Sequence, residues 1–212
     1  MPRKHLLLLV LAGLWCPGCQ QLGYLLHLIA PEEPTQSVDP EYKELPGHNL
    51  AVLIYADTSV QCDYPSVRAE LSMVLCKELR EKVKNLRVVD YRRTIRYQDE
   101  NIYWDAMDKT KLGKVFEADH LLLVSLTEFT TREPGSINLY RGRISAEASL
   151  YKMDLPERQS RVWRAEDIRV VYPPQDPTGE LVENDLQLRY ETERQFAEKL
   201  AQKFYKHKAP KQ

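Results

Sequence analysis

The feature that most constrains the fold is a short apolar run at residues 50–55, LAVLIY, which lies between Pro46-Gly47 and Asp57-Thr58. A run that is apolar throughout and bounded by turn residues predicts a strand buried on both faces. Such strands occur in sheets that are covered by helices, so this run favours an α/β protein.

Helices and further strands alternate after this run. Pro65 suits the first turn of a helix, and apolar residues then recur at helical spacing over residues 67–83. Residues 86–91 predict a second short strand, residues 107–117 a shorter helix, and residues 121–129 a third strand. This order of strands and helices indicates an α/β core.

The pattern changes in the carboxy-terminal half. Residues 139–155 alternate between apolar and polar side chains, and residues 162–172 form another long strand after the polar turn 156–161. Two such strands predict an antiparallel hairpin with one solvated face. Residues 184–206 predict an amphipathic helix. Its inward residues are expected to be Leu186, Tyr190, Phe196, Ala197, Leu200, Ala201 and Phe204.

The expected fold class is therefore α/β. We expect a three-layer-like mixed sheet with flanking helices, a carboxy-terminal antiparallel hairpin and a final amphipathic helix.

The amino-terminal segment, MPRKHLLLLVLAGLWCPGC, has the features of an export signal. Arg3 and Lys4 form a positive start, and the apolar run 6–15 is too short to span a bilayer but suits a signal-peptide core. Small Gly18 then precedes Cys19. This arrangement resembles the lipobox of bacterial lipoproteins, in which the cysteine becomes the first mature residue and carries acyl chains.

Two alternatives to lipidation at Cys19 stay open. The segment is also compatible with a signal peptide cleaved elsewhere, or with an uncleaved anchor that continues through residues 22–29. Cys16 is a poorer lipidation site because the bulky Trp15 precedes it.

The composition of residues 30–46 shifts to Pro, Glu, Ser and Thr without periodicity, which predicts a linker. An irregular strap packed over the domain is an equal alternative for its second half. The expected organisation is a lipoprotein signal peptide at 1–19, a tether at 20–46, one α/β domain at 47–207 and a tail at 208–212.

Several short motifs connect the body to a known family. They are Ala51-Val52-Leu53 in the first strand, residues 86–90 in the second, and Leu112-Gly113 followed by Ala118-Asp119-His120-Leu121-Leu122. In this order they resemble the family that includes the TolB amino-terminal domain, the curli-secretion lipoprotein and the lipoprotein activator of a penicillin-binding protein. The resemblance implies a non-enzymatic envelope module with a mixed sheet, used for protein contacts or within an assembly, and it implies no catalytic residues.

Composition excludes several kinds of site. With 30 basic and 31 acidic residues the net charge is −1, which gives no electrostatic reason to expect nucleic acid as a partner. The eight glycines are dispersed and form no phosphate loop, and the cysteines and histidines lack zinc spacing, so we expect no cofactor and no metal. We expect Cys76 to be a buried apolar residue, with a bridge to Cys62 as the alternative.

Two groups of residues are candidates for a partner interface. Arg92, Arg93 and Arg96 form the densest basic cluster, although a solvated strand end also accounts for them. On the expected hairpin, Tyr140, Arg141, Trp163 and Arg164 are of types enriched at binding hot spots, and they are also ordinary sheet residues.

The sequence thus predicts a lipoprotein anchored to a bacterial envelope membrane through acyl chains on Cys19, expected at the outer membrane facing the periplasm. We expect it to be a non-enzymatic protein-binding or scaffolding module with an unidentified envelope partner, and homo-oligomerisation stays open. One alternative is a subunit of an envelope secretion assembly. Another is an envelope hydrolase, for which the candidate residues are Asp99, Glu100 and Asp105 near Trp104, or Cys62.

Overall fold

A computed structural model of the chain describes residues 35–133, 135, 140–174 and 185–211. The chain divides into two compact units, and the larger one, Val38–His207, contains the five-stranded sheet and the helices. The smaller unit contains most of a two-stranded sheet made by β1 (Thr35–Val38) and β7 (His207–Pro210).

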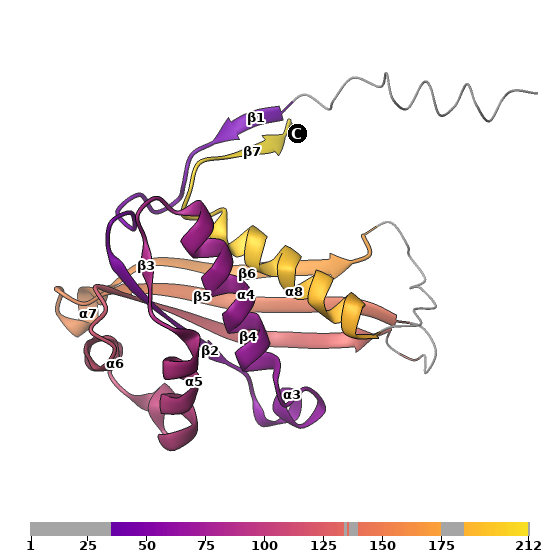
Figure 1. Cartoon of the computed structure of the whole chain (residues 1–212), viewed down its shortest axis with the longest axis horizontal. Coiled ribbons are helices and arrows are strands. Elements are labelled where there is room, and N and C mark those ends of the chain that lie inside the picture. The colour runs from indigo at the N-terminus through magenta and orange to yellow at the C-terminus, as the bar shows by residue number, and fades with distance from the viewer. Residues whose placement is uncertain (1–34, 134, 136–139, 175–184, 212) are drawn as a thin grey trace, which may run out of the picture. The chain divides into compact units, whose positions relative to one another are not determined.

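The larger unit is built on a mixed sheet with the strand order β3-β2-β4-β5-β6 (Figure 1). Strand β2 is parallel to both of its neighbours, whereas β5 is antiparallel to both β4 and β6. This arrangement confirms the predicted mixed sheet and carboxy-terminal hairpin. The strands are β2 (Asn49–Tyr55), β3 (Arg87–Val88), β4 (His120–Arg132), β5 (Tyr140–Lys152) and β6 (Arg161–Tyr172).

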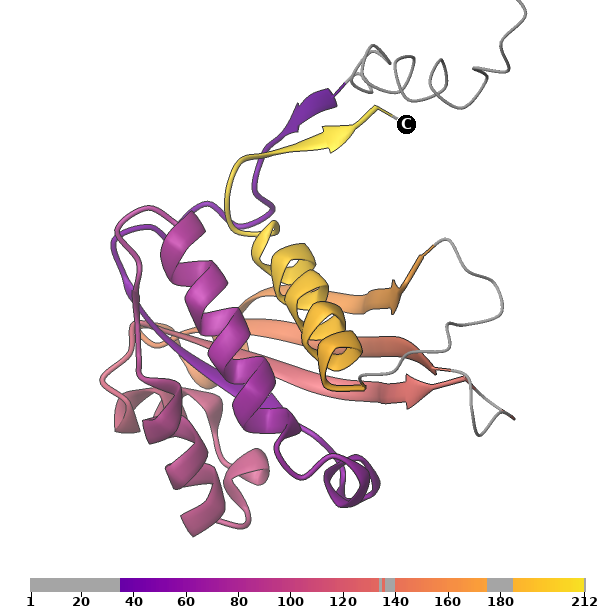
Figure 2. The ribbon, with the colours of Figure 1, turned by 45° about the vertical axis from the view of Figure 1, so that its right-hand side comes forward.

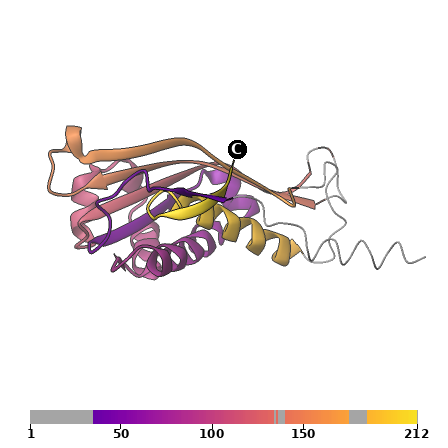
Figure 3. The same ribbon diagram turned by 90° about the horizontal axis from the view of Figure 1, so that it is seen from above.

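Helices cover both faces of the parallel part of this sheet. Helices α4 (Val67–Lys82) and α8 (Asp185–Ala201) lie side by side on one face (Figures 2 and 3). The larger core lies between these two helices and the sheet, and its members from β2 are Leu50, Val52 and Ile54. On the other face, η1 (Trp104–Ala106) and α6 (Lys109–Val115) pack against Ala51 and Leu53. Both sides of β2 are therefore buried, as its continuous apolar run predicts.

Aspartate caps explain where the structure departs from the predicted elements. Residues 58–63, for which no helix was predicted, form α3 (Thr58–Asp63), because Asp57 accepts a hydrogen bond from the Val60 N–H at 2.9 Å. The predicted strand 86–91 is reduced to β3, because Asp90 caps a new helix, α5 (Tyr91–Glu100). Asp108 caps α6 in the same way.

The final helix ends at Ala201, before the predicted end at 206. The prediction of which residues on this helix face the core was partly wrong. Leu186 and Tyr190 are 71% and 48% exposed, whereas Leu188 and Thr192 face the core. Thr192 is accommodated because its hydroxyl donates to the Leu188 carbonyl at 2.7 Å and because Gly142 on β5 has no Cβ to collide with it. Because Thr192 is polar, the sequence pattern did not indicate that the helix face with Leu188 and Thr192 is the buried one.

The segment before β2 packs against the domain. Tyr42 and Leu45 are buried in the larger core, and Glu41 accepts hydrogen bonds from Trp163 Nε1 at 2.9 Å and from Lys203 at 2.7 Å. Of the two alternatives for the second half of residues 30–46, the structure therefore supports a packed strap.

Cys62 is exposed and Cys76 is buried, and both thiols are free. This confirms that Cys76 is an apolar core residue, and burial raises the pKa of its thiol to about 12.

Candidate functional site

Strand β2 is the point at which two crossovers diverge. The connection from β2 to β3 passes through α4 on one face of the sheet, and the connection from β3 to β4 passes through α6 on the other. In open α/β sheets, ligands bind outside the carboxyl end of a strand at such a switch point. The carboxyl end of β2 is therefore the position at which this topology predicts a binding site.

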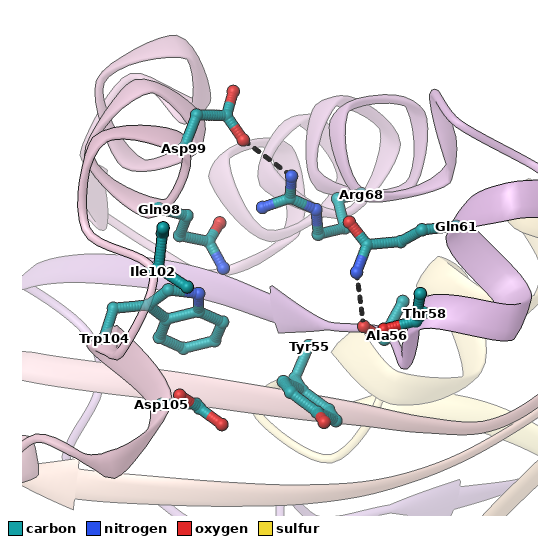
Figure 4. A pocket seen from close by; sticks show the side chains of 10 residues that line it. All are labelled: Tyr55, Ala56, Thr58, Gln61, Arg68, Gln98, Asp99, Ile102, Trp104 and Asp105. Carbon is teal, nitrogen blue, oxygen red and sulfur yellow. Dashed lines mark hydrogen bonds and ion pairs between the residues drawn. The ribbon is translucent and has the colours of Figure 1, made fainter.

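A cavity of about 370 Å³ lies there, next to the last residue of β2 (Figure 4). Its walls come from the chain after β2, the first turn of α4, the last turn of α5 and the segment that follows α5. The lining residues are Tyr55, Ala56, Thr58, Gln61, Arg68, Gln98, Asp99, Ile102, Trp104 and Asp105.

Two glutamine side chains are held in fixed orientations by carbonyl groups at the end of β2. Gln98 Nε2 donates to the Ile54 carbonyl at 3.0 Å, and Gln61 Nε2 donates to the Ala56 carbonyl at 2.7 Å. Because each amide nitrogen faces a backbone oxygen, each amide oxygen points the other way, on the side of Arg68 (Figure 4).

Arg68 closes one side of the cavity. Its Nη2 donates to Asp99 Oδ1 at 2.6 Å, and the two side chains are 17% and 55% exposed. Arg68 Nε and Gln98 Oε1 are buried, and neither has a hydrogen-bond partner within the part of the chain that the structure describes. A buried donor and a buried acceptor that lack partners each cost about 1–3 kcal/mol, so this site has unused hydrogen-bonding capacity.

Aromatic side chains form the opposite wall. The rings of Tyr55 and Trp104 lie with centroids 6.2 Å apart and planes inclined at 58°. Trp104 is only 6% exposed and belongs to the smaller core, whereas Ile102 at the rim is 81% exposed. The cavity thus combines planar polar groups, ring faces and an exposed apolar rim, a mixture that suits binding of a small ligand.

The residues considered for a hydrolase are only partly brought together. Asp99 and Asp105 both line the cavity, but Asp99 is engaged by Arg68. Glu100 and Cys62 are not among the residues that line it, and Cys62 lies exposed on α3. In the described ranges, no group of three or more His, Cys, Asp or Glu residues could hold a metal ion.

A second polar cluster lies at the opposite, amino end of β2. Asp119 accepts a hydrogen bond from the Asn49 N–H at 2.8 Å and lies 3.5 Å from His48 Nδ1. The Asn49 N–H is the main reason why the pKa of Asp119 is lowered. His120 instead points into the protein, where its Nε2 lies 3.0 Å from the Tyr42 hydroxyl. The neighbours Asp119 and His120 therefore do not form a catalytic pair.

His120 is fully buried, and the ring of His48 packs edge-on against it with centroids 5.1 Å apart. Burial, with a smaller contribution from the nearby charges of His48 and Lys152, lowers the pKa of His120 to about 4. This arrangement keeps the imidazole neutral and suits a structural contact between β4 and the strap.

The predicted basic cluster lies on helix α5 and not at a strand end. Arg92 lies 3.7 Å from Asp90, and Arg93 donates to the Val115 carbonyl at 2.8 Å. Arg96 is exposed and lines a shallow hollow with Tyr91 and Ile95. The three arginines thus share one exposed helix surface.

The hairpin residues of the predicted interface do not form one patch. Trp163 packs edge-on against Phe204 on the helix-covered side. Arg164 points to the uncovered face of the sheet and pairs with Glu147 at 2.9 Å. Arg141 forms an ion pair with Glu133 at 3.7 Å, and Tyr140 lies half-buried opposite Arg132.

Cys19, the predicted lipidation site, lies outside the described residues. Among the helices that the structure describes, none is long and apolar enough to cross a membrane.

Sequence reasoning missed Gln61, Arg68 and Gln98. The first two follow the carboxyl end of a clearly predicted strand, so the switch-point rule was a usable signal for them. Gln98 had no such signal, because it lies on a helix that was not predicted.

Comparisons with known proteins find similar solved structures only. No protein-family model matches the chain. No curated protein matches it either. A PelC dodecamer from Paraburkholderia phytofirmans is 10% identical, with a TM-score of 0.42, over 80% of this chain and 98% of that chain.

Two lipoproteins are similar at lower TM-scores. Lipoprotein GNA1162 from Neisseria meningitidis is 16% identical with a TM-score of 0.35, over 61% of this chain and 87% of that one. A putative lipoprotein from Caulobacter crescentus CB15 is 12% identical with a TM-score of 0.33, over 72% and 84%. Similarities of this size transfer no function, partner or oligomeric state, and the TolB-family resemblance stays a prediction.

Proposed function

We propose that the chain is an exported bacterial lipoprotein, held at an envelope membrane by acyl chains on Cys19, and that its body is a non-enzymatic binding module. The observation that carries the anchor is Gly18-Cys19 shortly after the apolar run 6–15, which Arg3 and Lys4 precede. Several acyl chains at about 0.8 kcal/mol per buried methylene make such an attachment durable.

The tether gives the binding role its mechanism. A body held near a membrane meets an envelope partner at a raised effective concentration, so modest affinity is sufficient. We place the protein at the outer membrane facing the periplasm, and a homo-oligomer is compatible with this role.

Two features of the cavity at the end of β2 favour binding over catalysis. Asp99 is committed to an ion pair with Arg68 at 2.6 Å, which limits its use as an acid or base. The pinned amides of Gln61 and Gln98 are hydrogen-bonding groups that do not titrate.

Metabolic labelling with a fatty-acid analogue tests the anchor. The wild type and Cys16→Ala should carry the label, and Cys19→Ala should not. Cys16→Ala is the matched control because it changes a cysteine three positions away in the same segment. Label that persists on Cys19→Ala, or that is absent from the wild type, contradicts the proposal.

A hydrolase is the second candidate, favoured by one observation: Asp99 and Asp105 line the same cavity as Trp104. It requires a hydrolytic activity that Asp105→Asn abolishes. If Asp99→Asn and Asp105→Asn both retain full function in cells, this candidate is eliminated.

A secretion-channel subunit is less favoured. A pore requires a further long amphipathic hairpin, whereas β5 and β6 are paired within the domain's own sheet.

A further inference from the structure

The cavity presents one unpaired donor and one unpaired acceptor from two different helices. Arg68 Nε belongs to α4 and Gln98 Oε1 to α5, and both are buried without a partner among the residues that the structure describes. Their orientations are set by other bonds, since Arg68 Nη2 is held by Asp99 and Gln98 Nε2 by the Ile54 carbonyl. Both atoms are closed to solvent in the ligand-free protein, so a ligand pairs with them only after the side chains at the rim have moved.

The chemistry of this pair selects the ligand group. A carboxylate or phosphate accepts from Arg68 but leaves the Gln98 oxygen unpaired, and an ammonium donates to Gln98 but leaves the arginine N–H unpaired. A secondary amide carries both an N–H and a C=O, so it satisfies both atoms. A water molecule does so too, but it fills only about 30 Å³ of the space. A hydroxyl also donates and accepts, so an amide-free sugar is the ligand that tests this alternative.

The remaining walls suit a neutral molecule larger than water. Tyr55 and Trp104 provide ring faces for its apolar parts. The Gln61 oxygen, turned toward Arg68, is a further acceptor for a hydroxyl or a second N–H (Figure 4). The cavity volume of about 370 Å³ is in the range of small-molecule sites.

We propose that this cavity binds a neutral small molecule through a secondary amide, whose N–H donates to Gln98 Oε1 and whose C=O accepts from Arg68 Nε. The rim opens to admit it, because the Arg68–Asp99 ion pair is exposed on the aspartate side and such pairs are weak. The inference rests on the proposed binding role but not on the anchor, which the Cys19 labelling tests separately.

Two sources of the amide are distinguished by equilibrium dialysis with the full-length protein in detergent micelles. N-acetylglucosamine represents an acetylated sugar, and glucose is its amide-free counterpart. N-acetylalanine methylamide represents a peptide, and methyl O-acetyllactate, in which ester oxygens replace both N–H groups, is its counterpart. We expect at least one amide to bind saturably and its counterpart to bind about tenfold more weakly.

Variants then locate the site. Gln98→Met removes the acceptor, and Arg68→Lys removes Nε while it keeps a charge for Asp99; each should weaken amide binding about tenfold. Gln195→Met on α8 is the matched control and should leave binding unchanged. Circular dichroism and thermal midpoints verify that each variant is folded.

The proposal is overturned if neither amide binds saturably, if the counterparts bind as tightly as the amides, or if both site variants, while folded, bind like the wild type. The comparison of amide with counterpart needs only the wild-type protein, so a variant that fails to fold does not leave the question open.

Discussion

The two ends of β2 differ in how they treat polar side chains. At the amino end, Asp119, His48 and His120 contact one another, Asn49 and Tyr42, and His120 Nδ1 is buried without a partner in the part of the chain that the structure describes. At the carboxyl end, polar side chains surround a cavity and leave Arg68 Nε and Gln98 Oε1 unpaired within the described ranges. Both ends contain residues that look like candidates for chemistry, but the cavity gives the carboxyl end room for a ligand. The two ends differ because only the polar side chains at the carboxyl end surround this cavity. A neighbouring cavity, and not the types of the polar residues, therefore distinguishes a candidate binding site from a structural contact.

Replacing Tyr42 at the amino end and Tyr55 at the carboxyl end by alanine should give the largest difference in the free energy of unfolding. Tyr42 is 9% exposed in the core, so Tyr42→Ala should lower the free energy of unfolding by about 3 kcal/mol. Tyr55 is 36% exposed beside the cavity, so Tyr55→Ala should cost about 1 kcal/mol. Urea denaturation measures both, and equal losses would break the comparison.

Acidification should weaken the amino end. The pKa of His120 is depressed to about 4 in the folded protein, so the unfolded chain binds more protons between its ordinary pKa of 6.5 and pH 4. In a Glu193→Gln background, which removes an overlapping titration of opposite sign, the free energy of unfolding should therefore fall by about 2 kcal/mol as the pH is lowered through this window. His120→Gln should remove this dependence, whereas Gln98→Met should leave it intact. A wild-type pH profile that matches that of His120→Gln would show that His120 does not control acid stability.

An effect of opposite sign comes from Glu193 on α8, and it must be removed to see the His120 transition clearly. Burial and the charge of Glu70 raise the pKa of Glu193 to about 8, although Arg189 opposes the shift. The folded state then binds more protons than the unfolded chain between pH 4.5 and 8, so stability falls as the pH rises through that window.

Glu193→Gln should accordingly raise the free energy of unfolding by about 1 kcal/mol at pH 8 and flatten this part of the profile. Glu191→Gln, a change on a more exposed position of the same helix, is the control and should have little effect. Destabilisation by Glu193→Gln at pH 8 would show that the carboxylate form is the one that the fold needs.

The sequence predicted the amino end of this comparison better than the carboxyl end. The apolar runs of β2 and β4 and the alternation in β5 revealed the sheet. These features depend on local apolar patterns, which sequence preserves.

The site was harder because it depends on tertiary contacts. Asp90 was assigned to a strand, although its side chain caps α5, and without that helix Gln98 had no predicted position. Arg68 lies in the helix that was predicted at residues 67–83, but nothing in its neighbourhood indicates that Asp99, 31 residues later, will pair with it. Long-range pairing of this kind has no local signature.

The central claim, that the carboxyl end of β2 is the binding site, is tested most directly by mapping amide ligands on the protein. Nitrogen–proton spectra of the full-length protein should be recorded in detergent with N-acetylglucosamine and with N-acetylalanine methylamide. The account predicts that the side-chain signals of Gln61, Gln98 and the Trp104 indole shift with one of them, while backbone signals at Asn49 and His120 stay in place. Shifts confined to the amino end of β2, or no shifts with either ligand, would contradict it.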